Sequence, residues 1–150
     1  MRLNISNHEF NEFSADFEKK LNLMAEHVLS DQREDNLNIN LKFVSSSEMK
    51  KLNKEFRKKS LDTNVLSFAA SKEIQEISGE LGDIAMSIPY IKIESQNLNR
   101  DVEDHMMHLL AHGILHLLGF DHNQDKDANI MESREIKYLE NFNIANPYKL

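Results

Sequence analysis

Apolar residues recur along the chain at two different spacings, which predict where helices and strands lie. Steps of three and four residues from Phe10 to Val28 are typical of an amphipathic helix. Strict alternation from Leu37 to Phe43 is typical of a strand with one buried face. Shorter strands are expected at residues 2–6, 65–68 and 81–87.

Polar residues ahead of the next apolar stretches mark where further helices begin. Ser45 and Glu48 form a capping box, and the helix that follows is expected to bury an apolar face that includes Phe56. Ser87 followed by Pro89 marks another start, because proline is tolerated in the first turn of a helix.

Two more helices complete the predicted order. Residues 101–118 predict the most apolar helix of the chain, and residues 126–141 predict a last helix with Glu135 on its inner stripe. Strands and helices interleave without a regular repeat. We therefore expect one α+β domain, residues 1–150, in which a mixed sheet of about four strands packs with about five helices.

The composition narrows the possible functions. The chain of 150 residues has the size of one domain, and it contains no cysteine, which excludes disulfides, thiolate zinc sites and cysteine nucleophiles. Its 18 basic and 25 acidic side chains give a net charge of −7, which argues against coating nucleic acid or membrane through bulk charge. Because no apolar leader or membrane span is visible, we expect a soluble, cytoplasmic protein.

The histidines are concentrated in one segment. Five of the seven lie within residues 105–122, where uniform placement would put about one. His112 and His116 are one helical turn apart, about 40° around the axis, so their imidazoles can share one metal ion.

A third ligand requires that the helix end first. In a continuous helix His122 would lie about 15 Å along the axis from His112, too far for one ion whose bonds are about 2 Å long. Gly119 stands where a helix end is expected, since glycine adopts the left-handed conformation without a steric penalty. We therefore predict a site of three histidines with a fourth position open, which is the catalytic arrangement.

Three residues near the predicted ligands, His105, His108 and Asp121, are not assigned as ligands. His108 forms the same pair with His112 and is a competing ligand, but only the later pair is followed by the glycine and the third histidine. We expect His108 to support the site and His105 to lie near its mouth. Asp121 either orients a ligand imidazole or stabilises a turn.

The ligand spacing also resembles the His-x-x-x-His-x-x-Gly-x-x-His motif of metzincin proteases. Those enzymes need a glutamate directly after the first histidine as general base, and this chain has Gly113 there. A zincin-like metal-binding helix is therefore expected, whereas peptide hydrolysis is disfavoured.

A basic stretch precedes one of the short predicted strands. Six of the 18 basic residues fall between residues 50 and 59. Such a run is often a solvated helix face, which we expect for Lys50 and Lys51, but beside a metal site the rest of the run also fits a local phosphate-binding strip. Arg57 is the best candidate, because one guanidinium contacts two phosphate oxygens at once.

Residues 112–122, His-Gly-Ile-Leu-His-Leu-Leu-Gly-Phe-Asp-His, resemble the hallmark motif of the YbeY family, with Phe120 in place of a tyrosine. Residues 57–68 and 81–84 resemble two weaker motifs of the same family in the same order, so the resemblance covers nearly the whole chain. Members of this family are bacterial single-strand-specific endoribonucleases implicated in ribosomal RNA maturation.

The resemblance implies a zinc-dependent endoribonuclease that matures the 3′ end of 16S ribosomal RNA and acts in ribosome quality control. It implies one zinc ion per chain on His112, His116 and His122, with His112 and Arg57 as catalytic residues. A small-subunit ribosomal protein or an Era-type GTPase is a candidate partner, and no membrane partner is expected. Three positions before the strand depart from the family pattern: Ser60, Asp62 and Asn64.

Two interpretations of another class remain open. One is a zinc metalloprotease-like hydrolase, and the other is a ribosome-associated RNA-binding factor whose zinc is structural. No residue is assigned as general base. Imidazole ligands also suit nickel, copper and iron, so the identity of the metal stays open, as does the oligomeric state.

Overall fold

One mixed sheet organises the fold. The computed structural model describes residues 2–6, 10 and 12–149. The strands lie in the order β1-β2-β4-β3, in which β1, β2 and β4 run parallel and β3 runs antiparallel to β4. Their bounds are β1 (Leu3–Ser6), β2 (Asn38–Val44), β3 (Val65–Ala69) and β4 (Glu80–Ser87).

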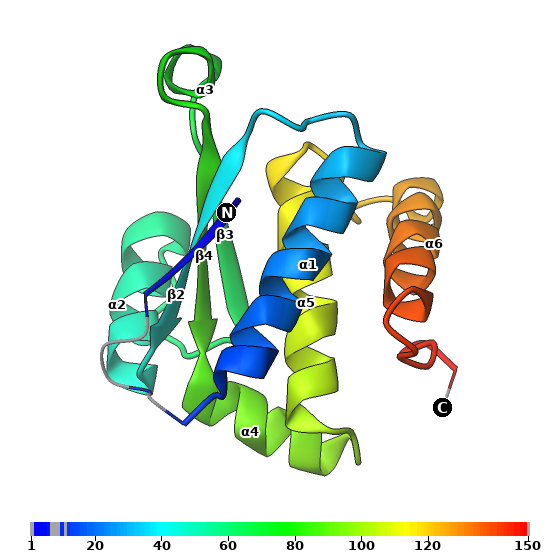
Figure 1. Ribbon diagram of the computed structural model, residues 1–150. Coiled ribbons are helices and arrows are strands. Elements are labelled where there is room, and N and C mark those ends of the chain that lie inside the picture. Colours follow the sequence, from blue (N-terminus) through cyan, green and yellow to red (C-terminus); the bar gives the residue numbers. More distant parts are fainter. Residues whose placement is uncertain (1, 7–9, 11, 150) are drawn as a thin grey trace.

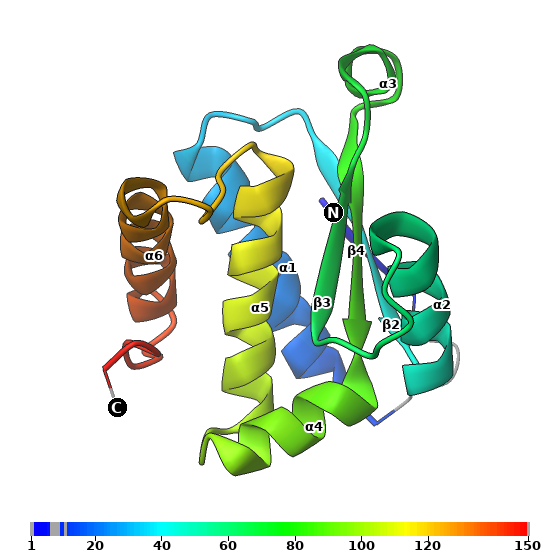
Figure 2. The same ribbon diagram turned by 180° about the vertical axis from the view of Figure 1, so that it is seen from behind.

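Helices cover both faces of this sheet. The helices are α1 (Ala15–Asp31), α2 (Ser46–Arg57), α3 (Lys72–Ser78), α4 (Ile88–Asn97), α5 (Val102–Leu117) and α6 (Asp125–Glu140). α1 and α5 lie side by side on one face, and α2 lies on the other (Figure 1). α6 packs on α5 on the side away from the sheet, and α4 and α3 lie at opposite ends of the molecule (Figure 2).

Side-chain caps fix the start of four helices. The side chain of each cap accepts a hydrogen bond from the backbone N–H three residues later, and the caps are Ser14, Ser45, Ser71 and Asp101. Ser45 therefore caps α2 as predicted, but the side chain of Glu48 pairs with Lys42 rather than closing the capping box. Pro89 lies in the first turn of α4, as predicted.

The α+β class and the four-stranded mixed sheet are confirmed, with three differences in detail. Six helices are present among the described residues rather than about five, because α3 has only 7 residues, none of them buried, and so is too short to show a repeated apolar pattern. The first helix begins at Ala15 and not at Phe10. Phe56, expected in the core, is 56% exposed and packs against Phe68 with ring centroids 4.6 Å apart.

The main core lies between the sheet and the layer of α1 and α5. It is built from apolar side chains of both helices together with the inner faces of β2 and β4. α5 is buried along most of its length, so the helix that carries the histidines is held firmly against the sheet. In the part of the chain that the structure describes, no helix has both the length and the apolarity to cross a bilayer.

α5 approaches the sheet closely at Gly113. A Cβ at this position would lie 3.1 Å from both Ile84 Cδ1 and Ser67 Oγ, so a larger residue would have to push the neighbours apart. The Ser67 hydroxyl also donates a hydrogen bond to the carbonyl of Gly113 at 3.2 Å. This contact places strand β3 beside the turns of α5 that carry the candidate metal ligands.

A polar contact joins α6 to the end of α1. The hydroxyl of the buried Tyr138 donates to Asp31 Oδ2 at 2.6 Å and accepts from Gln32 Nε2 at 2.8 Å. The hydrogen bond from Tyr138 lowers the pKa of Asp31, and burial raises the pKa of Tyr138 to about 12. The carboxylate is therefore charged and the hydroxyl protonated near neutral pH, which keeps this contact intact.

The Tyr138→Phe substitution tests this contact, because it removes both hydrogen bonds and keeps the ring. We expect the free energy of unfolding near neutral pH to fall by about 1 kcal/mol in chemical denaturation. The pKa of Asp31 is lowered in the folded state, so its stabilising contribution is present above the ordinary value of 3.8 and is lost as the pH falls. The difference between variant and wild type should therefore shrink below about pH 4.

Tyr90→Phe, on the exposed side of α4, is the matched control and should leave stability unchanged. A Tyr138→Phe variant as stable as this control would contradict the assignment.

Candidate metal centre

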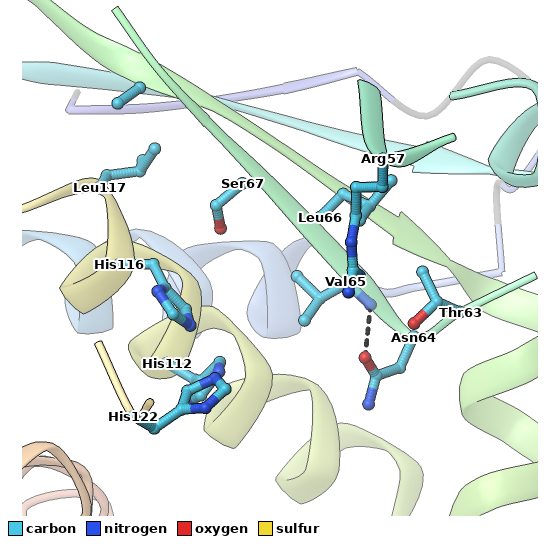
Figure 3. Close-up of a pocket in the computed structure, with 11 residues that line it drawn as sticks. Arg57, Thr63, Asn64, Val65, Leu66, Ser67, His112, His116, Leu117 and His122 are labelled. Atoms are coloured by element: carbon cyan, nitrogen blue, oxygen red, sulfur yellow. Dashed lines mark hydrogen bonds between the residues drawn. The ribbon is translucent and has the colours of Figure 1, made fainter. Parts of the chain in front are cut away.

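Three histidines converge on one point in the structure. His112 and His116 project from adjacent turns of α5, and His122 reaches them from the loop that follows (Figure 3). One nitrogen of each imidazole lies within 4.8 Å of the others, which is close enough for a single ion to contact all three. His112 and His116 are half-buried, whereas His122 is exposed. The predicted ligands are thus brought together.

The loop geometry explains how His122 returns to the helix. α5 ends at Leu117, and Gly119 adopts a φ of 101°, in the left-handed region. The N–H of Gly119 bonds to the carbonyl of His116, and the N–H of Phe120 bonds to the carbonyl of Leu115. These bonds close the end of the helix and reverse the chain, as the position of the glycine predicts.

The surroundings of His116 favour the neutral imidazole that binds a cation. Burial lowers the pKa of His116, and the neighbouring His112 and His122 lower it further. A neutral imidazole has a free lone pair on one ring nitrogen, which is the form that binds a metal. The donor set therefore fits a divalent cation such as Zn²⁺, and its three ligands leave a fourth coordination position for a water molecule or a substrate oxygen.

A buried carboxylate orients the first ligand. Glu135, on α6, is 1% exposed, and its Oε2 accepts a hydrogen bond from His112 Nδ1 at 3.2 Å. Burial alone would raise the pKa of Glu135, but hydrogen bonds from His108, His112 and Tyr148 lower it to about 2. The ionised carboxylate only accepts, so Nδ1 of His112 carries the proton and Nε2 is left as the ligand atom.

A second set of contacts holds Glu135 in place. Its Oε1 accepts from His108 Nε2 at 2.6 Å and from the Tyr148 hydroxyl at 2.7 Å. Burial and the hydrogen bond to Glu135 raise the pKa of Tyr148, so this hydroxyl stays protonated. Arg100 Nη1 in turn donates to His108 Nδ1 at 3.3 Å, which requires that the proton of His108 lie on Nε2. Every proton in this chain of contacts is therefore assigned.

The network settles the roles of the remaining histidines of α5. His108 is not a ligand of the cluster and supports it through Glu135, as expected. His105 is 4% exposed and does not lie near the mouth of the site, because it is held by Glu94 at 2.7 Å and by Arg100 at 3.0 Å. Asp121 Oδ1 accepts from the N–H of Asn123, so it stabilises the turn.

Sequence reasoning missed the contribution of the last helix and the C-terminal segment. Glu135 was expected on the inner stripe of its helix, and a carboxylate at such a position was the available signal, because buried charges need partners. Tyr148 and Arg100 carried no comparable signal. Their contacts join segments that lie 13 and 8 residues from their partners Glu135 and His108 in sequence.

The histidines form one side of a cavity of about 450 Å³, and β3 with the segment before it forms the other. Arg57, exposed at the last turn of α2, lines this cavity together with Thr63, Asn64 and Ser67 (Figure 3). Among the described residues, no carboxylate lines the cavity wall. A guanidinium and three imidazoles that line one concave site suit an anionic substrate.

The position of Gly113 bears on the protease alternative. In metzincins the corresponding glutamate must reach the metal-bound substrate, but Gly113 faces Ile84 and Ser67 in the sheet. Gly113 has no side chain to act as the protease base, and that side of α5 has no room for a longer residue.

Two of the positions that depart from the family pattern have defined contacts. Asn64 Oδ1 accepts from the N–H of Val65 at 2.7 Å, and its Nδ2 donates to Glu94 Oε1 at 3.0 Å (Figure 3 draws the former). Asp62 Oδ1 accepts from the N–H of Thr63 at 2.9 Å. The amide of Asn64 thus fixes the start of β3, a contact in which the amide group donates as well as accepts. Nothing in the structure explains the serine at position 60.

Comparisons with known proteins agree with this geometry. The family model described as "Endoribonuclease YbeY" matches residues 4–143. The chain is 40% identical over 114 residues to the proteins named "Endoribonuclease YbeY" of Francisella tularensis subsp. holarctica (strain OSU18) and subsp. novicida (strain U112), with 73% of this chain and 70% of each relative covered. The solution structure of TM1509 from Thermotoga maritima is similar with a TM-score of 0.65 and 27% identity, over 92% of this chain and 87% of that one.

Glu135→Gln tests the role of the buried carboxylate. The amide keeps the size of the side chain but no longer supplies a charged acceptor to His112, so we expect the affinity for Zn²⁺ to fall about 10- to 100-fold. Competition with a chromophoric chelator measures this affinity. Glu140→Gln, at the exposed end of the same helix, is the control. Equal Zn²⁺ affinity in a folded Glu135→Gln variant and in this control would show that Glu135 does not orient the site.

Proposed function

The chain belongs to the YbeY endoribonuclease family, and from this premise we propose that one zinc ion on His112, His116 and His122 drives its cleavage of single-stranded RNA. The family makes the protein a hydrolase that cuts RNA internally in ribosomal RNA processing. The observation that carries the zinc proposal is the convergence of three imidazole nitrogens within 4.8 Å, in a cavity that also contains Arg57.

Each residue of the site has a distinct part in this proposal. A divalent ion bound here supplies Lewis-acid polarisation of a phosphoryl oxygen and increases the acidity of a water molecule. His112 would hold such an ion through Nε2, because its Nδ1–H donates a hydrogen bond to Glu135. Arg57 donates to the non-bridging phosphate oxygens and stabilises the charge that develops on them.

Two observations support an exchangeable catalytic ion over a structural one. Structural zinc sites are closed by four protein ligands, whereas this cluster offers three. The third ligand, His122, is exposed and borders an open cavity, so a substrate oxygen has access to the fourth position. An RNA-binding factor with a structural zinc ion is therefore the weaker candidate.

We propose the single-stranded 3′ end of the 16S ribosomal RNA precursor as the substrate. The basic residues between 54 and 59 lie at the end of α2 and just beyond it, and Arg57 among them lines the cavity. The whole chain has a net charge of −7, which repels RNA, so binding to naked RNA should be weak and salt-sensitive. A small-subunit ribosomal protein or an Era-type GTPase would compensate for this by placing the cytoplasmic enzyme on its substrate.

Arg57→Ala tests the phosphate-binding role. Because the guanidinium is assigned to the charge of the transition state, we expect the rate of RNA cleavage to fall on the order of 100-fold. The zinc affinity should not change, because Arg57 is not a ligand. Lys51→Ala is the matched control, since it removes an exposed positive charge from the same helix and should retain nearly full activity. Equal activities of the two variants on a precursor 3′-end RNA would refute the role of Arg57.

The double variant His112→Ala/His116→Ala tests the metal itself. It should contain no zinc after purification, whereas wild type should contain about one ion per chain. Cleavage by wild type should stop on chelation and return with added Zn²⁺. Cleavage that survives both chelation and the double substitution would belong to a contaminating nuclease and would overturn the proposed function.

A further inference from the structure

A second cavity opens beside the metal centre. Its volume is about 320 Å³, and it shares three wall residues, Asn64, Val65 and His112, with the cavity of the three histidines. It follows α5 toward the N-terminus of the helix, where His105 and His108 lie on the same face as His112. The two cavities therefore adjoin each other at His112 and at the start of β3.

The lining of the second cavity includes one cation, Arg100, and one carboxylate, Glu94. Arg100 donates through Nη1 to the Nδ1 atoms of His105 and His108, and within the described residues its Nη2 and Nε have no hydrogen-bond partner. Glu94 Oε1 accepts from His105 and from Asn64, while its Oε2 is without a partner in the same part of the chain. Arg100 and Glu94 thus offer both donors and an acceptor to a ligand.

The sides of the same cavity are apolar and partly exposed. Leu98, at the end of α4, is 40% exposed, and Tyr148, in the C-terminal segment, is 44% exposed. The Tyr148 ring is held in place, because its hydroxyl bonds to Glu135 at 2.7 Å and the ring meets His108 edge to face at 5.5 Å between centroids. An aromatic ring that is fixed in this way stacks on a ligand with little further loss of side-chain entropy.

We propose that this cavity binds the base of a nucleotide next to the scissile phosphate, with Tyr148 as the stacking surface. The inference rests on the proposed endoribonuclease function, which places RNA at the metal centre. A nucleobase has two apolar faces that stack on aromatic and aliphatic side chains, and a polar edge that pairs with donors and acceptors.

A base fits the cavity better than a second phosphate does. One imidazole separates the guanidinium of Arg100 from each of two carboxylates: His105 lies between Arg100 and Glu94, and His108 lies between Arg100 and Glu135. These carboxylates repel a further negative charge. A neutral base with hydrogen-bond donors and acceptors meets no such repulsion. Single-stranded RNA also exposes its bases, which a duplex does not, so the cavity gives a physical reason for a preference for single strands.

Abasic RNA provides the test. A short fluorescent single-stranded RNA and a set of copies, each with one abasic position, are titrated with zinc-loaded protein and followed by fluorescence anisotropy. A gel run after each titration reports cleavage separately. For wild type, one abasic position should weaken binding on the order of 5- to 100-fold, and the other positions should have much smaller effects.

The protein variants identify the stacking residue. Tyr148→Ala should weaken binding of intact RNA by a similar factor and should no longer distinguish the sensitive abasic position. Tyr148→Phe loses the hydrogen bond to Glu135 but keeps the ring, so it should still distinguish that position. Leu98→Ala removes the other apolar wall and should weaken the discrimination. Ile77→Ala removes an 87% exposed apolar side chain on the distant α3 and should match wild type.

The proposal is overturned if no abasic position stands out in wild type, or if folded Tyr148→Ala and Leu98→Ala variants discriminate as wild type does. The gel keeps this outcome apart from a failure of the proposed function. RNA that stays intact with zinc-loaded wild type, while the pattern of abasic binding is as expected, contradicts the nuclease activity and leaves the base-binding cavity supported.

Discussion

The end of α5 at Leu117 is the constraint on which the metal centre depends. Two ligands one turn apart on a helix are easily placed, but a third at residue 122 reaches the same ion only if the chain reverses within five residues. Gly119 makes this reversal possible through its left-handed backbone, and its neighbours satisfy the last carbonyls of the helix. The tight packing of α5 against the sheet at Gly113 then fixes the site beside β3. Asn64, Ser67 and Arg57 line the side of the cavity that lies opposite the histidines.

The buried network behind the ligands explains why α6 and the C-terminal segment belong to the functional centre. Glu135 is a charge with almost no solvent contact, and it is tolerated because two imidazoles and one hydroxyl donate to it. The same contacts fix the tautomers of His108 and His112. The orientation of the His112 ring therefore depends on the position of Glu135 on α6. Tyr148 of this network also lines the adjoining cavity, so the C-terminal segment contributes a side chain to both parts of the site.

The parts of the structure that sequence reasoning predicted are those encoded by local patterns. The convergence of the three histidines, the helix end at Gly119 and the four strands each follow from spacing, capping or alternation within about ten residues. The helix Lys72–Ser78 was missed because its 7 residues are too few to show a repeated apolar pattern. Phe56 was misplaced because an apolar stripe does not reveal whether a partner covers it. The roles of Glu135, Arg100 and Tyr148 depend on tertiary contacts, which no spacing in the sequence encodes.

X-ray absorption spectroscopy at the zinc edge of the zinc-loaded protein tests the central claim most directly, because it reports the number and type of atoms around the ion. The structure predicts three imidazole nitrogens at about 2.0–2.1 Å and one further oxygen ligand that exchanges with solvent or with a phosphate analogue. A spectrum with a fourth ligand from the protein, or with fewer than three imidazoles, would contradict an open centre built on His112, His116 and His122 and with it the catalytic role assigned to the metal.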